Sequence, residues 1–185
     1  VKKQLFQTLP CDFHEMYGAS EIATAADLNR EQAVSKPESV GVSCPGVEIR
    51  IVDENFLDCK PMVVGQIIVK SPLASAGYYH LPETTEESFV DDFFLTGDLG
   101  YLDEEGYLFF VERKKDVIIT GGMNIYPSDI ESVLSMHPNV RECATVGIHD
   151  PFLGEVPVAV VVCLGVDRTV EREMRSMAQQ KLAAC

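Results

Sequence analysis

Short runs rich in hydrophobic, strand-favouring residues recur in the first part of the chain. Such runs occupy residues 47–52, 65–70 and 107–111, and they are separated by clusters of turn-forming residues such as 103–106. Short β-rich runs between turn clusters are typical of strands. We therefore expect an antiparallel, twisted sheet or part of a barrel in this region.

The pattern changes after residue 115. A strand is expected at residues 116–120, then a loop at Gly121-Gly122 and a helix that begins at Pro127, because proline is favoured in the first turn of a helix. The rest of the chain predicts two strands and a second helix, at residues 140–148, 156–164 and from about 169. This β-α-β-β-α order indicates a small α+β module.

Composition places the chain among globular proteins of one or two domains. Hydrophobic residues make up 46% and charged residues 24% of its 185 positions, which is enough apolar material for a real core. The balance of 15 Lys and Arg against 29 Asp and Glu gives a net charge of −14. This negative field repels phosphate backbones and anionic membrane surfaces, so nonspecific nucleic-acid binding is not expected.

Neither a membrane span nor a disulfide framework is expected. The longest apolar run, residues 156–164, is far shorter than the roughly 20 residues that a membrane helix needs, and the first residues lack the apolar stretch of a signal peptide. The six cysteines form no C-x-x-C pair and have no histidine spacing suited to zinc. We expect a cytoplasmic protein with free thiols.

Two short segments contain candidate nucleotide-binding residues. At Tyr17-Gly18, a planar base could lie on the ring while the backbone at the glycine approaches a phosphate, but the same pair could simply end a strand. Glu21 could hold Mg²⁺ or be a solvated acid. Asp98 could accept hydrogen bonds from two ribose hydroxyls, or it could be a turn residue that bonds its own backbone.

Two further segments follow. Arg113 and the two lysines after it could contact a phosphate or a ribose, although most charge runs are solvated. The pair Gly121-Gly122 could bring a ligand close to the main chain, but hairpin turns use the same residues. Neither G-x-x-x-x-G-K-[ST] nor a strand-G-x-G-x-x-G-helix pattern occurs. Taken singly, each segment leaves both interpretations open.

Their order and spacing strongly resemble the AMP-forming acyl-CoA synthetase superfamily, which also includes peptide-synthetase adenylation domains and firefly-type luciferases. The resemblance covers nearly all 185 residues. The segments that carry it are YGASE (17–21), GQIIVK (65–70), GYY (77–79) and the stretch TGDLGYLDEEGYLFFVERKKDVIITGGMNIYPSDIE (96–131).

The resemblance implies a role for each candidate residue in binding ATP or AMP. Tyr17 resembles the aromatic that stacks on adenine, next to Gly18, and Ser20 stands where the family usually has a threonine beside the α-phosphate. Glu21 resembles the carboxylate that binds Mg²⁺. Asp98 resembles the aspartate that holds the ribose hydroxyls.

Residues from the second part of the chain are implied in both the nucleotide site and the catalytic steps. Arg113 resembles an arginine that also reaches the ribose. Lys115 resembles the hinge about which the small domain rotates, a position where the family carries Asp or Lys. Gly121 and Gly122 resemble the loop that enters the active site for thioester formation, beside the coenzyme A tunnel.

The resemblance also implies an incomplete enzyme. Residues 1–114 are expected to be the C-terminal part of the large AMP-binding domain, β-rich and like a distorted barrel, and residues 115–185 an incomplete small α+β C-terminal domain. The family's Ser/Thr/Gly-rich ATP loop is absent, and so is its distal catalytic lysine, a role that Lys181 does not fit. This chain alone is therefore expected to be inactive.

The implied activity is that of an ATP-dependent acyl-CoA ligase. Residues 121–131 and 133–150 are more similar to fatty-acyl and aryl-acyl ligases than to peptide-synthetase domains. The expected partners are a small carboxylic acid, ATP and coenzyme A, with no nucleic acid and no membrane span; the oligomeric state stays open. The alternatives are a peptide-synthetase adenylation domain and a noncatalytic product that binds a nucleotide or a protein.

Overall fold

The computed structural model describes residues 11–164 and 168–182, together with Leu5 and Thr8. Contacts between Cα atoms divide the chain into two compact units, Val1–Val111 and Glu112–Cys185. The expected division after residue 114 falls in the 3-10 turn η1 (Lys114–Asp116). The hinge role of Lys115 stays a prediction.

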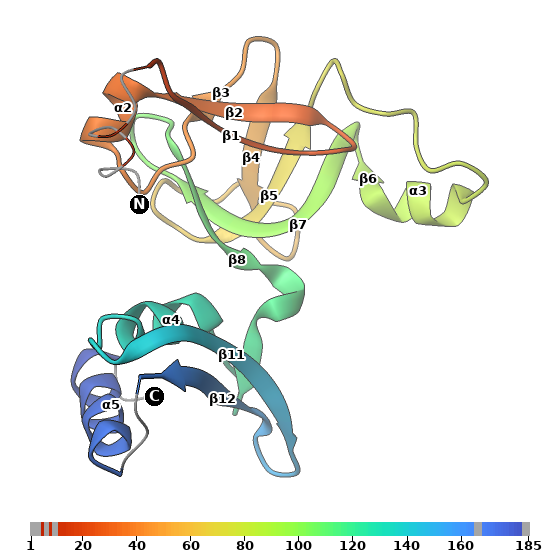
Figure 1. Cartoon of the computed structure of the whole chain (residues 1–185). Coiled ribbons are helices and arrows are strands. Elements are labelled where there is room, and N and C mark those ends of the chain that lie inside the picture. The colour runs from red at the N-terminus through yellow and green to blue at the C-terminus, as the bar shows by residue number, and fades with distance from the viewer. Residues whose placement is uncertain (1–4, 6–7, 9–10, 165–167, 183–185) are drawn as a thin grey trace. The chain divides into compact units, whose positions relative to one another are not determined.

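A three-stranded antiparallel sheet contains the first candidate motif (Figure 1). Its strands, in spatial order, are β1 (His14–Ala19), β2 (Ala23–Asn29) and β3 (Val42–Ser43). Helix α2 (Arg30–Ser35) begins directly after β2, because Asn29 and Gln32 form a capping box in which each side chain accepts a hydrogen bond from the other's backbone at 2.9 Å. This pair satisfies amide groups that a helix start otherwise leaves without partners.

A five-stranded sheet forms the rest of the first unit, in the order β4-β5-β7-β6 with β8 paired to β7. Helix α3 (Pro82–Ser88) directly precedes β6. The strands are β4 (Glu48–Val52), β5 (Gly65–Lys70), β6 (Phe89–Val90), β7 (Phe93–Leu102) and β8 (Leu108–Arg113). The expected antiparallel, β-rich first part is confirmed.

Both sheets of the first unit contribute to one hydrophobic core. Ile22, Ala25 and Ala26 from the first sheet and its hairpin pack with five residues of the second, namely Ile51, Ile67, Val69, Phe94 and Leu108. Each of these side chains is at most 5% exposed. Removing this apolar surface from water stabilises the arrangement of the two sheets, and it holds β1 and β7 in fixed positions.

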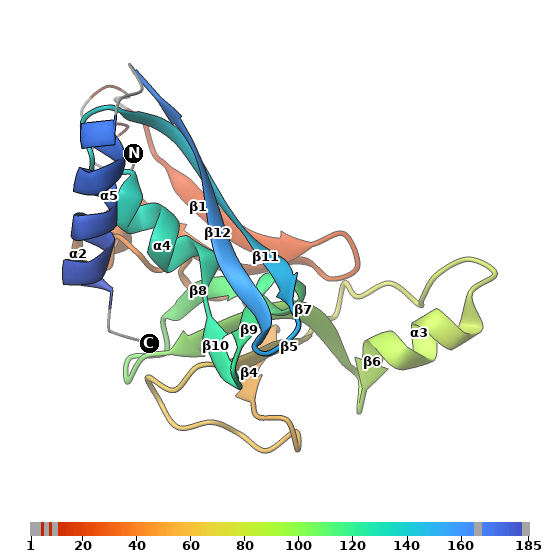
Figure 2. The ribbon, with the colours of Figure 1, turned by 90° about the horizontal axis from the view of Figure 1, so that it is seen from below.

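The second unit is a four-stranded sheet with two helices, and its α+β class is confirmed. The sheet order is β10-β9-β12-β11, and α4 packs against both β11 and α5 (Figure 2). The elements are β9 (Ile118–Thr120), β10 (Met123–Ile125), α4 (Pro127–Leu134), β11 (Val140–Asp150), β12 (Gly154–Cys163) and α5 (Arg168–Lys181).

One connection differs from the sequence-based expectation. Gly121 and Gly122 do not lead straight into the helix, because they form the turn of a hairpin between β9 and the additional strand β10. Their φ angles are 56° and 85°, and two consecutive left-handed residues are what a tight hairpin turn requires. The order is therefore β-β-α-β-β-α. Asp116, expected in the strand, lies in the 3-10 turn.

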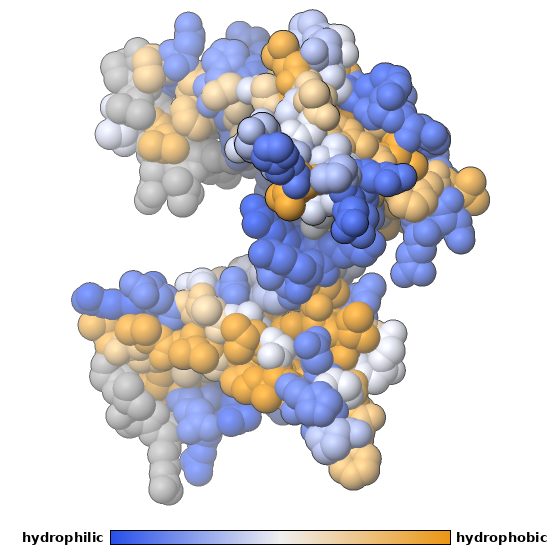
Figure 3. Space-filling model, turned by 90° about the vertical axis from the view of Figure 1, so that its right-hand side faces the viewer, coloured by the Kyte–Doolittle hydropathy of each residue, from blue (hydrophilic) through white to orange (hydrophobic). Residues whose placement is uncertain are grey.

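One face of the β11–β12 hairpin carries exposed hydrophobic side chains. Val146, Ile148, Val160 and Val162 are each about half exposed, at 50%, 49%, 60% and 51%, and Figure 3 shows hydrophobic atoms over a broad area of this unit. Within the described residues, no helix combines the length and the apolar character that crossing a membrane requires.

Candidate functional site

A hydrogen bond joins two of the predicted site residues in the first unit. The hydroxyl of Tyr17, in β1, donates to Oδ2 of Asp98, in β7, at 2.8 Å. Both residues are partly buried. Two motifs that are 81 residues apart in sequence are therefore in direct contact.

Asp98 is held in this position by a bulge in β7. Gln66 of β5 pairs with Leu99 and Ile68 pairs with Leu95, so three residues of β7, 96–98, lie opposite the single residue Ile67 of β5. Asp98 was expected in a turn, and that expectation is wrong: the strand continues through the bulge to Leu102. Bulges of this kind redirect side chains and are common beside functional sites.

The bulge is fixed by its own hydrogen bonds and by a glycine. Thr96 Oγ1 donates to the carbonyl of Ile67 at 2.7 Å and accepts from the backbone N–H of Asp98 at 3.1 Å. Gly97 has a φ of 74°, a conformation that side chains with a Cβ atom rarely adopt. Thr96 and Gly97 thus hold the bulge that turns the carboxylate of Asp98 toward Tyr17.

The structure gives Gly18 a local reason that does not involve a ligand. A Cβ atom at this position would lie 2.1 Å from the carbonyl oxygen of Ala23, across the hairpin of β1 and β2. The pairing register also shifts between Tyr17 and Gly18. Close approach of two backbones therefore explains why this residue is glycine.

Ser20 and Glu21 lie in the turn between β1 and β2. Ser20 is exposed, whereas the Glu21 carboxylate accepts a hydrogen bond from the hydroxyl of Tyr78 at 2.7 Å. This bond raises the pKa of Tyr78, because it favours the protonated phenol. The backbone N–H of Ser75 donates to the carbonyl of Glu21 at 2.7 Å, so the hairpin turn is tied to the loop that contains Tyr78.

Glu21 fits Mg²⁺ that is bound together with a nucleotide. In the part of the chain that the structure describes, no three His, Cys, Asp or Glu side chains are grouped closely enough to hold a metal ion by themselves. Protein-bound Mg²⁺ commonly uses one or two carboxylates plus substrate phosphates and water. A single carboxylate, oriented by Tyr78, suits that coordination.

The other predicted residues lie in the second unit and on its surface. Arg113 ends β8 and is exposed, as is Lys115 in the turn η1. Gly121 and Gly122 are exposed in the β9–β10 turn, where the N–H of Gly121 donates to the carbonyl of Leu153 at 2.8 Å. That bond joins the glycine turn to the loop between β11 and β12.

Two residues that shape the site were not assigned roles from the sequence. Tyr78 positions Glu21 and Thr96 positions Asp98. Both stand in segments that carry the family resemblance, GYY and TGD, but a hydrogen bond across 57 residues, as between Glu21 and Tyr78, leaves no periodic signal in a sequence.

Comparison with protein families agrees with this arrangement of motifs. Residues 1–79 match the family described as AMP-binding enzyme, and residues 129–185 match the AMP-binding enzyme C-terminal domain. The chain belongs to the AMP-binding enzyme family. One match falls in each unit of this AMP-binding family member, and residues 80–128, which contain Asp98, Arg113 and Lys115, lie between the two matches.

Several ligases are similar to this member of the AMP-binding family. A 2-succinylbenzoate–CoA ligase from Listeria monocytogenes serotype 4b is 42% identical over 165 residues, which are 89% of this chain and 32% of the relative. A long-chain-fatty-acid–CoA ligase from Bacillus subtilis is 36% identical over 91% of this chain and 30% of the relative. The chain thus spans about a third of the length of these proteins.

A solved structure supports the fold of this family member. The o-succinylbenzoate CoA synthetase from Bacillus subtilis, in complex with its acyl-adenylate intermediate, superposes with a TM-score of 0.87 at 33% identity. The match covers 99% of this chain and 37% of the synthetase.

Proposed function

We propose that this protein acts as an AMP-forming acid–thiol ligase. It activates a carboxylic acid as an acyl-adenylate, transfers the acyl group to coenzyme A, and releases pyrophosphate and AMP. The observation that carries the proposal is the hydrogen bond between Tyr17 and Asp98, which joins the two motifs expected to hold adenosine. The names of the similar proteins, which are CoA ligases, support it.

The chemistry requires two steps at one site. A carboxylate is a poor acyl donor, because its negative charge repels nucleophiles and because substitution at its carbon would have to expel an oxide ion, which is a very poor leaving group. Attack of the carboxylate on the α-phosphate of ATP releases pyrophosphate and creates a good leaving group, AMP. The coenzyme A thiol then attacks the acyl carbonyl and expels AMP. The second transition state has a different geometry, so the enzyme must rearrange between the steps.

The first unit supplies the proposed nucleotide contacts. The ring of Tyr17 stacks on adenine, and its bond to Asp98 fixes the ring orientation. Asp98 still has acceptor capacity for ribose hydroxyls, since an ionised carboxylate has about four lone-pair positions. Gly18 and Ser20 lie next to the phosphates. Glu21 holds Mg²⁺, which neutralises phosphate charge.

The second unit supplies the proposed groups for rearrangement. Arg113 contacts the ribose, and its fixed positive charge suits a nucleotide. Lys115 is the hinge, and the turn of Gly121 and Gly122 enters the site for thioester formation. Rotation about a few residues at an element's end is a common way to exchange one set of active-site groups for another.

The similar ligases favour an aryl or fatty acid as the substrate, and a CoA ligase over a peptide-synthetase adenylation domain. Their printed substrates, 2-succinylbenzoate and long-chain fatty acids, are the first acids to test. Small-molecule partners, a cytoplasmic location and the inactivity of the 185 residues alone stay predictions.

Pyrophosphate exchange tests the proposal, using protein expressed from the complete reading frame that encodes these residues. We expect exchange that depends on at least one of 2-succinylbenzoate, benzoate and palmitate, and thioester formation when coenzyme A is added. The 185-residue chain in the same assay is expected to show none. AMP binding without exchange for any acid would favour the noncatalytic alternative. Acyl transfer to a carrier protein but not to coenzyme A would favour the adenylation domain.

A further inference from the structure

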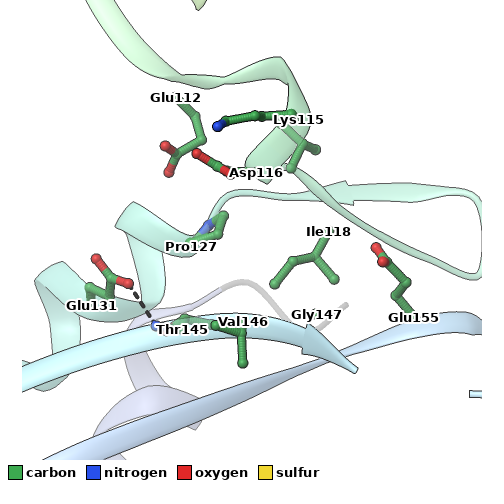
Figure 4. A pocket seen from close by; sticks show the side chains of 11 residues that line it. Glu112, Lys115, Asp116, Ile118, Pro127, Glu131, Thr145, Val146, Gly147 and Glu155 are labelled. Carbon is green, nitrogen blue, oxygen red and sulfur yellow. Dashed lines mark hydrogen bonds between the residues drawn. The ribbon is translucent and has the colours of Figure 1, made fainter. Parts of the chain in front are cut away.

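A cavity of about 390 Å³ lies entirely within the second unit (Figure 4). Its wall contains four carboxylates, from Glu112, Asp116, Glu131 and Glu155, and one ammonium group, from Lys115. These side chains come from β8, η1, α4 and β12. In Figure 4, Glu131 and Glu155 lie at opposite sides of the cavity, and the other three lie along a third side.

Backbone amides orient three of the four carboxylates. Glu131 Oε1 accepts from the N–H of Thr145 at 2.7 Å, and Glu155 Oε2 accepts from the N–H of Ile119 at 3.2 Å. Glu112 Oε2 accepts from the N–H of Ser128 at 3.3 Å. Each carboxylate keeps further acceptor capacity, so the wall is an ordered set of acceptors.

The charge of this wall is not balanced by the protein. Among the described residues, no Lys, Arg or His makes an ion pair within 4.0 Å with any of the four carboxylates. Of the described residues that line the cavity, Lys115 alone is basic. The four carboxylates repel one another, and the single ammonium group of Lys115 offsets only part of their charge. A bound cation would relieve the remaining repulsion.

A buried hydroxyl also points to a ligand. Thr145 lines the cavity and is only 7% exposed, and its Oγ1 has no hydrogen-bond partner among the residues that the structure describes. An unsatisfied buried hydroxyl is unfavourable, and most buried polar groups in proteins have a partner. An N–H group of a ligand in the cavity would supply one.

The spread of the carboxylates fits an extended organic cation better than a compact metal ion. In the described part of the chain, no three acidic, histidine or cysteine side chains come close enough to bind one metal ion. The carboxylates are spread around a cavity whose volume suits a small molecule. A chain of methylene groups with spaced ammonium groups can reach several of them at once.

We propose that this cavity binds a linear aliphatic polyamine. Its ammonium groups pair with Glu131, Glu155 and the acids beside Lys115, and one N–H is donated to Thr145 Oγ1. None of the residues that line the cavity is a proposed nucleotide contact, and only Lys115 is also proposed to act in catalysis.

Calorimetric titration of the 185-residue chain with spermidine tests the proposal. We expect one saturable site, and weaker binding of butylamine, which carries a single charge. Glu131→Gln and Glu155→Gln each keep an oxygen that accepts from the backbone amide but remove the negative charge. Each is therefore expected to lower the affinity for spermidine about tenfold, as loss of a charge-assisted hydrogen bond does. Lys115→Ala is expected to tighten binding, because it removes the competing cation.

Glu142→Gln is the matched control, because Glu142 is an exposed acid of β11 that does not line the cavity. It is expected to change spermidine affinity less than twofold. Thr145→Val distinguishes an effect on binding from an effect on stability. It is expected to raise the midpoint of thermal unfolding, since it removes an unsatisfied hydroxyl, but to lower the affinity for spermidine. Absence of saturable binding, an equal effect of Glu142→Gln, or tighter binding of Mg²⁺ than of spermidine would overturn the proposal.

Discussion

The hydroxyl of Tyr17 donates a 2.8 Å hydrogen bond to Oδ2 of Asp98, and the two residues belong to strands of different sheets. The bond fixes the tyrosine ring relative to the carboxylate. A flat surface and a hydrogen-bond acceptor at a fixed separation suit the base and the sugar of one nucleoside, so we expect affinity for adenosine to depend on both residues.

Two substitutions distinguish the contribution of the Tyr17 ring to AMP binding from that of its hydroxyl. Tyr17→Phe keeps the aromatic surface and removes the hydroxyl that donates to Asp98, so we expect a loss of about 1 kcal/mol in AMP binding. Tyr17→Ala also removes the stacking surface and is expected to lose more, by about 1 to 3 kcal/mol. Calorimetry with AMP gives both values. Equal affinities of the Tyr17→Phe and Tyr17→Ala variants for AMP would contradict stacking of adenine on this ring.

Asp98 and Arg113 are expected to hold the ribose. In the product of the complete reading frame, Asp98→Ala and Arg113→Ala should each weaken ATP use by about 1 to 3 kcal/mol, because each leaves ribose hydroxyls without a partner. The measurement is the KM for ATP in pyrophosphate exchange. If the KM for ATP of both variants stays within twofold of the value of the parent protein, these residues are structural or surface groups only.

Gly18 is expected to be required for folding whether or not a nucleotide is bound. In Gly18→Ala the new Cβ would lie 2.1 Å from the Ala23 carbonyl oxygen, and relieving such overpacking typically costs about 1 to 3 kcal/mol. Gly106→Ala is the control, because its Cβ meets nothing within 4 Å and only its φ of 82° is unfavourable. Urea unfolding measures both. A Gly18→Ala protein as stable as the parent would leave ligand approach as the reason for glycine here.

Lys115→Pro tests the hinge. Proline fixes φ near −65° and removes the N–H, so it should hold the turn η1 in one conformation. In the product of the complete reading frame we expect adenylate formation to persist and thioester formation from a supplied adenylate to fall. Lys115→Ala removes the charge but leaves the dihedral angles free. An equal loss in both variants would assign the effect to charge, and no loss in either would place the hinge elsewhere.

Asp103 is expected to make the first unit sensitive to acid. Burial raises the pKa of its carboxyl, but hydrogen bonds from Lys36 Nζ at 2.7 Å and from the N–H groups of Tyr107 and Glu105 outweigh burial, and the net pKa is lowered below its usual 3.8. A lowered folded-state pKa gives stability that is present above pH 3.8 and lost as the pH falls through the folded value.

The measurement is urea unfolding of the parent chain and of Asp103→Asn at pH 7, 5 and 3. The variant is expected to have a lower free energy of unfolding than the parent chain at pH 7. This difference between the two proteins should narrow only below the usual carboxyl pKa of 3.8. Glu104→Gln, at an exposed neighbouring position, is the control and should follow the parent chain at each pH. A difference that does not change with pH would show that the charge of Asp103 contributes nothing.

Local sequence was sufficient to predict three strands of the first unit, β4, β5 and β8, and the elements of the second unit other than η1 and β10. The strand at residues 65–70 has the predicted bounds, and the helices at Pro127–Leu134 and Arg168–Lys181 begin within a residue of where their first-turn signals place them. Helical periodicity works here because one face of each helix meets the core, whereas the strand at residues 65–70 is recognised as a short apolar run whose two faces are both buried. The motifs that carry the family resemblance are likewise local strings.

Tertiary structure decided what each motif residue contacts. The bulge that turns Asp98 toward Tyr17 depends on the register between β5 and β7, and Gly18 is glycine because another strand passes close to it. The cavity between Glu131 and Glu155 likewise arises only when α4 and β12 are in place. Register and close approach are set by packing between segments far apart in sequence, where no local period records them. The sequence by itself determined the elements and the chemistry available, and the folded chain decided which of those groups meet.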